Sequence, residues 1–202
     1  FNASSIYLIN DLKDLEQDKL HPIKKLRPLP AGLITTAQAL ILAILLSASS
    51  LTLAFYLNPK FGVLLAGYWV MMILYTFKLK HVVIVDILII SSGFIIRAIS
   101  GAVVLNVMIS RWLIACTIFL SLFLILTKRR NEIIELGSEA ASHRAILQEY
   151  GVNFLDQMIA VVTACTIFSY VLYTVDPETI AKFHTHGLIF TVPFVIYGIF
   201  RY

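Results

Sequence analysis

Long apolar stretches alternate with short charged segments along this chain of 202 residues. The longest apolar stretch, Leu33 to Leu57, is a run of 25 residues without a charge. As a helix it would be roughly 37 Å long, which is enough to cross a membrane with some tilt. The pattern predicts further spans at 61–77, 82–105, 112–127 and 153–175, and the start of another at 188–200. Residues 1–9 are typical of the last turns of a membrane helix.

Composition supports an integral membrane protein. Hydrophobic residues make up 59% of the chain, charged residues 14%, and the mean hydropathy is +0.86, far from the averages of soluble domains. In lipid, only helices or closed barrels satisfy the backbone, so we expect one all-α domain over residues 1–202, a polytopic transmembrane helix bundle. Both cysteines lie in apolar stretches, which argues against a disulfide framework or a zinc site. Because the chain begins at Phe1 and stops directly after an apolar stretch, we expect a fragment of a longer protein.

Basic residues are distributed unevenly between the two sides of the predicted membrane. If the spans alternate, one side carries twelve Lys and Arg residues and the other side three. Cytoplasmic loops are enriched in these residues, so we expect the basic side to face the cytoplasm at the inner membrane. Aromatic and basic residues are not interleaved in the way that would indicate nucleic-acid binding. The basic side comprises residues 10–32, 78–81, 128–150 and Arg201, so its charged segments are expected to converge on one face of the bundle.

The charged segment 10–32 contains four acidic and five basic residues. Asp11, Asp14 and Asp18 are spaced by three and then four residues, which places them on one face of a continuous helix. Crowded carboxylates repel one another unless a cation lies between them, and Mg²⁺ prefers oxygen ligands together with substrate phosphates. The segment therefore predicts a Mg²⁺ site at a helix end, with these three aspartates as the metal ligands.

Two basic residues further along the same segment strengthen this interpretation. Lys24 and Arg27 are suited to neutralise phosphate oxygens, and a proline after Arg27 ends the segment. We therefore expect a diphosphate to bind together with the metal. The alternative is an ordinary solvated loop between helices, which is what most charge clusters are. The regular spacing of the aspartates and the Asn10 that precedes them favour a functional role.

Two charged residues interrupt the apolar stretch 82–105. Asp86 and Arg97 would each cost on the order of 3 kcal/mol if left alone at mid-membrane. Eleven residues apart, they lie within about 20° of each other around a helix but about 16 Å apart along it. We therefore expect both to face the bundle interior as substrate-facing groups, each with its own partner. A structural polar role that ties helices together is the alternative.

The second hydrophilic segment, residues 128–150, begins KRRNEIIE and has a helical pattern. Lys128, Arg129 and Glu132 directly follow a predicted span, and we expect them to belong to the site. Glu132, Glu135 and Glu139 repeat the three-then-four spacing of the aspartates. For Glu135 and Glu139 we favour the polar face of an interfacial helix over a second acidic cluster.

Taken together, these motifs are similar to those of a known enzyme family. Asn10-Asp11-x-x-Asp14-x-x-x-Asp18, followed by His21-Pro22-x-Lys24-x-x-Arg27-Pro28, resembles the first Asp-rich motif of the UbiA prenyltransferase superfamily. The segment Tyr75 to Ala102 and the motif Lys128-Arg129-x-x-Glu132 are most similar to its decaprenyl-phosphate phosphoribosyltransferase branch. The resemblance covers nearly the whole chain and implies an intramembrane bundle whose first and last helices are missing here.

The resemblance implies Mg²⁺-dependent transfer of 5-phosphoribosyl from phosphoribosyl diphosphate to a polyprenyl phosphate lipid. Pyrophosphate would be released, and the product would serve lipid-linked arabinan and cell-envelope glycan synthesis. Four residues are expected to be catalytic: Asp11, Asp14, Lys24 and Arg27. Eight are expected to bind substrate: Asn10, Tyr75, Lys80, Asp86, Arg97, Lys128, Arg129 and Glu132.

One departure from the general prenyltransferase pattern favours phosphoribosyl transfer. Prenyltransferases usually carry a second Asp-rich motif, DxxxD-like, where this chain has basic residues. Cations there suit a lipid monophosphate, whereas acids suit metal on a polyprenyl diphosphate. Glu132 and Glu135 keep open a second hypothesis, prenyl transfer from a diphosphate to an aromatic acceptor. A third is a transporter that uses Asp86 and Arg97 as pathway charges, but the inverted-repeat hydropathy typical of transporters is not seen.

Overall fold

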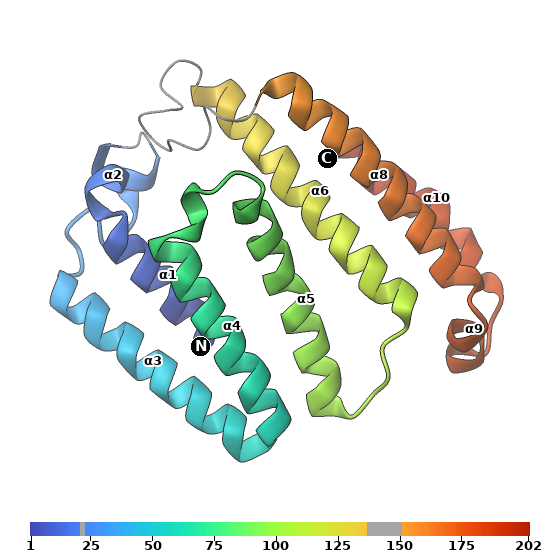
Figure 1. The fold of residues 1–202 in the computed structure, drawn as a ribbon, viewed down its shortest axis with the longest axis horizontal. Helices are drawn as coiled ribbons and strands as arrows, with labels where there is room; N and C mark the ends of the chain where they lie inside the picture. Colours follow the sequence, from blue (N-terminus) through green and yellow to red (C-terminus); the bar gives the residue numbers. More distant parts are fainter. Residues whose placement is uncertain (21–22, 137–150) are drawn as a thin grey trace. The chain divides into compact units, whose positions relative to one another are not determined.

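The computed structural model describes residues 1–20, 23–136 and 151–202 of the protein. Within these ranges the chain forms helices and no β-strand, which confirms the all-α prediction (Figure 1). The elements follow in the order α1 (Asn2–Lys13), α2 (Leu15–Leu20), η1 (Lys24–Leu26), α3 (Thr36–Leu57), α4 (Pro59–Phe77), η2 (Leu79–His81), α5 (Val85–Leu105), α6 (Arg111–Leu136), α8 (Val152–Val175), α9 (Pro177–Phe183), η5 (Gly187–Thr191) and α10 (Val192–Arg201).

Five of these helices are long and apolar enough to cross a membrane: α3, α4, α5, α6 and α8. They correspond to five of the predicted spans and support the assignment as an integral membrane protein. The sixth predicted stretch, 188–200, is helical and comprises most of η5 and α10. The preceding helix α9 is bent by 94° relative to the segment Gly187–Arg201. The bend follows His184, which ends α9 in the left-handed conformation with φ 52°.

Helix α6 is longer than the sequence predicted. The predicted span ends at Thr127, whereas α6 continues through the basic residues to Leu136. Lys128, Arg129 and Glu132 therefore lie on a direct extension of a membrane-spanning helix. The continuous helix fixes the positions of these three residues along the axis of α6.

Local sequence signals explain where α3 and α4 begin. Thr35 and Gln38 form a reciprocal capping box at the start of α3, in which each side chain accepts from the other residue's backbone N–H. Asn58 caps α4, and Pro59 occupies its first turn, where a missing N–H costs nothing. The polar pair between two apolar stretches thus ends one helix and starts the next.

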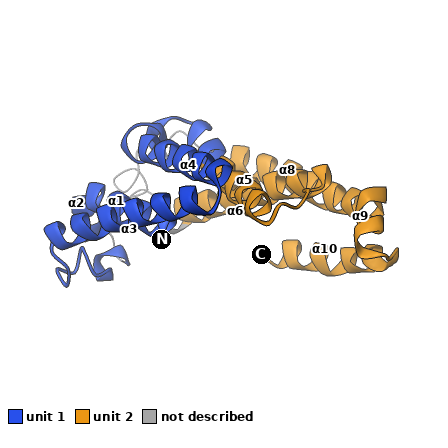
Figure 2. Ribbon diagram, turned by 90° about the horizontal axis from the view of Figure 1, so that it is seen from below, with its two compact units in different colours: residues 1–89, 138–146 blue, residues 90–137, 147–202 orange. Residues whose placement is uncertain are grey.

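The described residues form two compact units, each with its own core (Figure 2). Unit 1 comprises residues 1–89, and unit 2 comprises residues 90–136 and 151–202. Helix α5 begins in unit 1 and continues in unit 2. The prediction of one domain over residues 1–202 stays a prediction.

Small residues allow the helices of unit 1 to approach closely. Helix α1 packs against α3 and α4, and α3 packs along α4. The buried face of α3 is made of alanines and serines, as is typical of helix contacts in membranes: Ala39, Ala43, Ser47, Ser50 and Ala54. The indole Nε1 of Trp69 on α4 donates to Ser47 Oγ at 3.2 Å. This packing holds the charged end of α1 close to the end of α4.

In unit 2, α6 and α8 lie side by side (Figure 1). Arg130 Nε on α6 donates to Asp156 Oδ1 on α8, which ties the two helices near the charged end of α6. Ser91 on α5 and Ser121 on α6 share a buried hydroxyl hydrogen bond of 2.5 Å. A mostly apolar groove of about 650 Å³ lies between α6, α8 and α10, with the Arg130–Asp156 pair among its lining residues.

Candidate functional site

The aspartates of the charged segment lie on two helices rather than on one. Helix α1 ends at Lys13, Asp14 caps it with φ −96° and ψ 9°, and α2 begins at Leu15. The backbone N–H of Asp14 donates to Asn10 O at 2.9 Å, so Asn10 and Asp14 lie on the same side of the helix end. The helical register nevertheless continues across this junction, because the backbone N–H of Asp18 donates to Asp14 O at 2.9 Å. The predicted shared face of the three carboxylates therefore stays a prediction.

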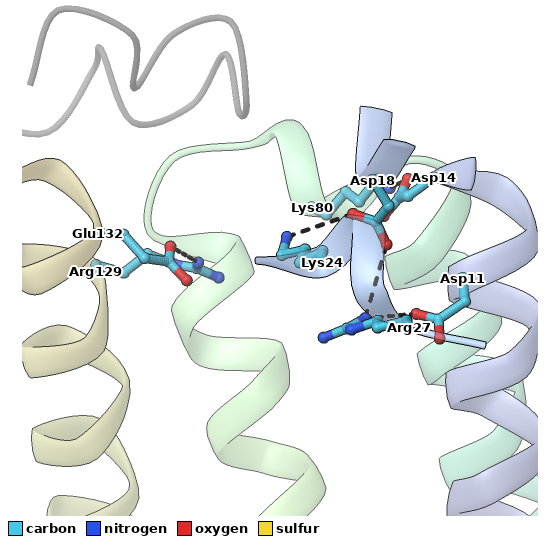
Figure 3. Close-up of polar contacts among 8 residues, drawn as sticks. All are labelled: Asp11, Asp14, Asp18, Lys24, Arg27, Lys80, Arg129 and Glu132. Carbon is cyan, nitrogen blue, oxygen red and sulfur yellow. Dashed lines mark hydrogen bonds and ion pairs between the residues drawn. The ribbon is translucent and has the colours of Figure 1, made fainter. Parts of the chain in front are cut away.

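Arg27 contacts two of the three carboxylates (Figure 3). Its Nη1 donates a hydrogen bond of 2.8 Å to Asp11 Oδ1 and lies 3.7 Å from Asp18 Oδ2. Lys24 Nζ lies 3.6 Å from the other oxygen of Asp18, Oδ1. The basic turn, defined as η1 together with Arg27, is thus placed against the end of α1 and against α2.

Lys80 contacts the third carboxylate. It lies on η2, directly after α4, and its Nζ donates to Asp14 Oδ1 across 66 positions of sequence. The Lys80 side chain is only 10% exposed, whereas the Asp14 carboxylate is 21% exposed. Charged segments 10–32 and 78–81 therefore meet at one end of unit 1, as the topology predicts for these two.

Each aspartate thus has a cation of the protein as its neighbour. Among the residues that the structure describes, no group of three or more His, Cys, Asp or Glu side chains is arranged to hold a metal ion. Mg²⁺ does not need such a group, because it is usually bound by one or two carboxylates plus substrate phosphates and waters. Asp11 and Asp14 are partly exposed, and Asn10 lies beside Asp14, so the donor set at the end of α1 fits a hard cation.

Burial raises the pKa of Asp11 above its ordinary value of 3.8. The loss of water around the carboxylate is the largest cause, and the nearby charges of Asp18 and Asp14 act in the same direction. The Arg27 guanidinium opposes the shift through its charge and its hydrogen bond, but it does not outweigh burial. A cation additional to Arg27 would therefore be favourable beside Asp11.

This raised pKa predicts a measurable effect of pH on stability without metal. On acidification, the folded state takes up a proton at Asp11 before the unfolded state does, so the Asp11 contribution makes folding more favourable as pH falls towards 3.8. Thermal unfolding in detergent with EDTA should show this contribution as a difference between the wild type and Asp11→Asn. The variant should be at least as stable near neutral pH, and its relative advantage should shrink on acidification. Parallel pH profiles for the two proteins would contradict the prediction.

The Lys80–Asp14 pair predicts a loss of stability when its cation is removed. Lys80→Met leaves the Asp14 carboxylate without its buried partner. We expect a loss of roughly 2 kcal/mol, below the value for a fully buried pair because Asp14 retains some exposure. The thermal midpoint in detergent measures the effect, with Lys78→Met, at an exposed position on the same loop, as the control. Equal midpoints for both variants would contradict the prediction.

The remaining predicted residues of unit 1 are buried. Tyr75 is 8% exposed near the end of α4, and Asp86 is fully buried in the first turn of α5. Ile84, two residues before Asp86, has φ 66°, a conformation that is unfavourable for a β-branched side chain. The strained turn and the buried carboxylate occur together at the start of α5.

The predicted residues of unit 2 differ in exposure. Arg97 is exposed, with its guanidinium carbon 4.5 Å from the centroid of the Phe94 ring. Its exposure differs from that of Asp86, and the expectation that both side chains face the bundle interior stays a prediction. Arg129 is 3% exposed and donates to Glu132 Oε2 at 2.7 Å, whereas Lys128 is exposed.

Some of the sequence motifs fall outside the described residues, namely His21, Pro22 and Glu139. Conversely, the structure shows two cross-element ion pairs that sequence reasoning did not predict, Lys80–Asp14 and Arg130–Asp156. The sequence placed these charges in hydrophilic segments or beside apolar stretches but gave no indication of which residue each would pair with.

Comparison with known proteins agrees with this fold and these motifs. A decaprenyl-phosphate phosphoribosyltransferase from Mycolicibacterium smegmatis is 40% identical over 153 residues, which are 76% of this chain and 48% of that protein. A protein of the same name from Corynebacterium glutamicum is 36% identical over 180 residues, covering 87% of this chain and 54% of that protein. The chain therefore spans about half the length of these curated relatives.

A solved structure shares the fold. The structure of a UbiA homolog from Archaeoglobus fulgidus, bound to GPP and Mg²⁺, matches with a TM-score of 0.78 at 18% sequence identity. The match covers 98% of this chain and 69% of that one. The UbiA prenyltransferase family itself matches residues 1–134, which include the whole charged segment and the start of the second hydrophilic segment. The chain belongs to the UbiA prenyltransferase family.

Proposed function

We propose that the full-length protein transfers 5-phosphoribosyl from phosphoribosyl diphosphate to a polyprenyl phosphate, with Mg²⁺ and with release of pyrophosphate. The observation that carries the proposal is the cluster of ion pairs at one end of unit 1, in which Arg27 contacts Asp11 and Asp18, Lys24 contacts Asp18, and Lys80 contacts Asp14. Partly exposed carboxylates beside partly exposed cations suit a metal-bound diphosphate. Relatives named decaprenyl-phosphate phosphoribosyltransferase supply the choice of donor and acceptor.

In this proposal, Asp11 and Asp14 hold Mg²⁺ with support from Asn10. The bound metal would neutralise charge that builds up on the diphosphate leaving group. Lys24 and Arg27 bind diphosphate oxygens, for which their half-exposed side chains, 43% and 47%, leave them accessible. Lys80 is buried against Asp14, so it acts by holding that carboxylate rather than by contacting substrate.

The proposed transfer needs no catalytic base. An oxygen of the lipid phosphate attacks C1 of the ribose, the new C1–O bond forms, and the old C1–O bond to pyrophosphate breaks with its electron pair leaving on pyrophosphate. The second pKa of a phosphate monoester is about 6, so the lipid phosphate is mostly ionised at neutral pH and needs no base to remove a proton. Positioning and stabilisation of the leaving charge by the site therefore provide most of the catalysis.

For the site residues on α5 and α6, we keep the roles that were predicted from the sequence. Lys128 and Arg129 would orient the lipid phosphate or the ribose 5-phosphate, and Glu132 would position Arg129 through their ion pair. Asp86 and Arg97 on α5 would line the path of the substrates. The polyprenyl tail would lie between helices, and the membrane location would place the charged face towards the cytoplasm. The product would supply lipid-linked precursors of arabinan and other cell-envelope glycans.

A second candidate function is transfer of a prenyl group from its diphosphate to an aromatic acceptor. The structural likeness to a UbiA homolog bound to GPP and Mg²⁺ favours this candidate. Membership of a transferase family favours either reaction over transport. Both reactions would use a metal-bound diphosphate at the end of α1, and they differ in the group that is transferred.

Donor competition separates the two candidates. The full-length protein in liposomes would receive polyprenyl phosphate, an aromatic acid, Mg²⁺ and radiolabelled phosphoribosyl diphosphate, with and without a tenfold excess of unlabelled geranyl diphosphate or phosphoribosyl diphosphate. For phosphoribosyl transfer, only unlabelled phosphoribosyl diphosphate should suppress labelling of the lipid by about tenfold through isotope dilution and competition. Suppression by geranyl diphosphate together with formation of a prenylated aromatic acid would support prenyl transfer instead.

A further inference from the structure

The three aspartates differ in their burial. The Asp18 side chain is 6% exposed, whereas those of Asp11 and Asp14 are each 21% exposed. Burying an ionised carboxylate is costly unless it is paired with cations. Asp18 has two of them within 4 Å, one on each oxygen: Lys24 on Oδ1 and Arg27 on Oδ2.

Both cations come from the same short element. Lys24 begins η1, Arg27 caps it, and the Arg27 N–H donates to Lys24 O at 2.9 Å. Without an acid between them, two positive side chains held this close would repel each other and turn towards solvent. Asp18 is the carboxylate that both cations contact, and Arg27 is held in addition by its hydrogen bond of 2.8 Å to Asp11. Both basic side chains keep exposed surface for an anion (Figure 3).

The same geometry makes Asp18 unsuitable as a metal ligand. Mg²⁺ gives up its waters reluctantly and is usually held through accessible carboxylates. Asp18 is nearly closed to solvent, and each of its oxygens already faces a cation of the protein. Asp11 and Asp14 retain exposed carboxylate surface at the end of α1, on the other side of the junction.

We propose that Asp18 is a positioning residue that organises Lys24 and Arg27 into one diphosphate-binding unit and does not ligate the metal. This inference rests on the proposed function for its choice of anion. It divides the Asp-rich motif into two parts: the end of α1 serves the metal, and α2 serves the cations that bind the diphosphate. It replaces the prediction that all three aspartates bind Mg²⁺.

Two binding measurements on the full-length protein test the division without using turnover. Mn²⁺ alone is titrated by electron paramagnetic resonance, and inorganic pyrophosphate is titrated by calorimetry at saturating Mg²⁺. Asp18→Asn should leave Mn²⁺ affinity within about twofold of the wild type and weaken pyrophosphate by about tenfold or more. Asp14→Asn should lose Mn²⁺ binding. In transfer assays, Asp18→Asn should raise the donor KM more than it lowers kcat.

A double variant keeps the test valid if Asp18→Asn proves unstable. In a Lys24→Met/Arg27→Met background the cations that Asp18 organises are absent, so adding Asp18→Asn should change pyrophosphate affinity by less than about twofold. Loss of Mn²⁺ binding in Asp18→Asn, equal to that in Asp14→Asn, would overturn the proposal. The proposal would also be overturned if Asp18→Asn bound pyrophosphate as tightly as the wild type, or if the wild type bound neither Mn²⁺ nor pyrophosphate. Normal binding results with no phosphoribosyl transfer would refute the proposed function alone.

Discussion

Asp14→Asn is expected to reduce phosphoribosyl transfer by about a hundredfold to a thousandfold, the largest effect of any single substitution in the site. Asp14 lies at the junction of α1 and α2, has Asn10 beside it and is contacted by Lys80. The amide keeps the size of the side chain but removes the charge that would hold the metal and balance Lys80. Turnover would be measured with the full-length protein at saturating donor and Mg²⁺.

Glu16→Gln provides the matched control for this prediction. Glu16 lies on α2, two residues beyond Asp14, but its side chain is 83% exposed and pairs only on the surface with Lys19. Exposed pairs of this kind contribute little, so turnover should stay within about twofold of the wild type. Equal and small effects of Asp14→Asn and Glu16→Gln would show that the motif is a solvated charged loop.

Arg27→Met is expected to have the second largest effect, a loss of about a hundredfold in kcat/KM for the donor. Arg27 contacts both Asp11 and Asp18, so its removal takes away a diphosphate ligand and also loosens the basic turn. Arg27→Lys should recover part of the activity, because it keeps the charge but loses the forked geometry of the guanidinium. Initial rates at varied donor concentration measure both variants.

The control for Arg27 is Lys25→Met. Lys25 lies on the same turn, is exposed and carries the same formal charge, so it tests whether net positive charge alone matters. We expect less than about a threefold change in kcat/KM, in line with screening of an exposed charge. A loss as large as that of Arg27→Met would mean that the turn attracts the donor through its overall charge and that Arg27 has no specific contact.

Much of the fold could be predicted from the sequence because lipid imposes a simple rule. A mostly apolar stretch of about 20 residues must form a helix across the membrane, and five such stretches were identified, four of them within a few residues of both observed ends. The prediction was inaccurate where polar residues continue a helix. Helix α6 extends past Thr127 because its basic residues can remain helical outside the apolar core. The bend after α9 follows His184 in the left-handed conformation, for which the sequence carried no signal.

The site could be predicted only in part. The composition of the charged segment indicated carboxylates and cations together, and the structure brings Asp11, Asp18, Lys24 and Arg27 into contact. The one-residue break at Asp14 could not be predicted from the spacing of the aspartates, although the hydrogen bond from Asp18 N–H to Asp14 O carries the helical register across it. Lys80 was predicted as a site residue from its position after an apolar stretch, but its pairing with Asp14 depends on how α4 packs against α1.

The most direct test of the central claim is lipid labelling by the full-length protein in membranes. The membranes are incubated with radiolabelled phosphoribosyl diphosphate, polyprenyl phosphate and Mg²⁺, and label in the lipid phase is counted with and without EDTA. We predict label in the lipid that disappears with EDTA, returns when Mg²⁺ is restored, and is absent from the Asp14→Asn variant. Lipid labelling that persists in EDTA or in that variant would contradict a metal-bound diphosphate at the end of α1.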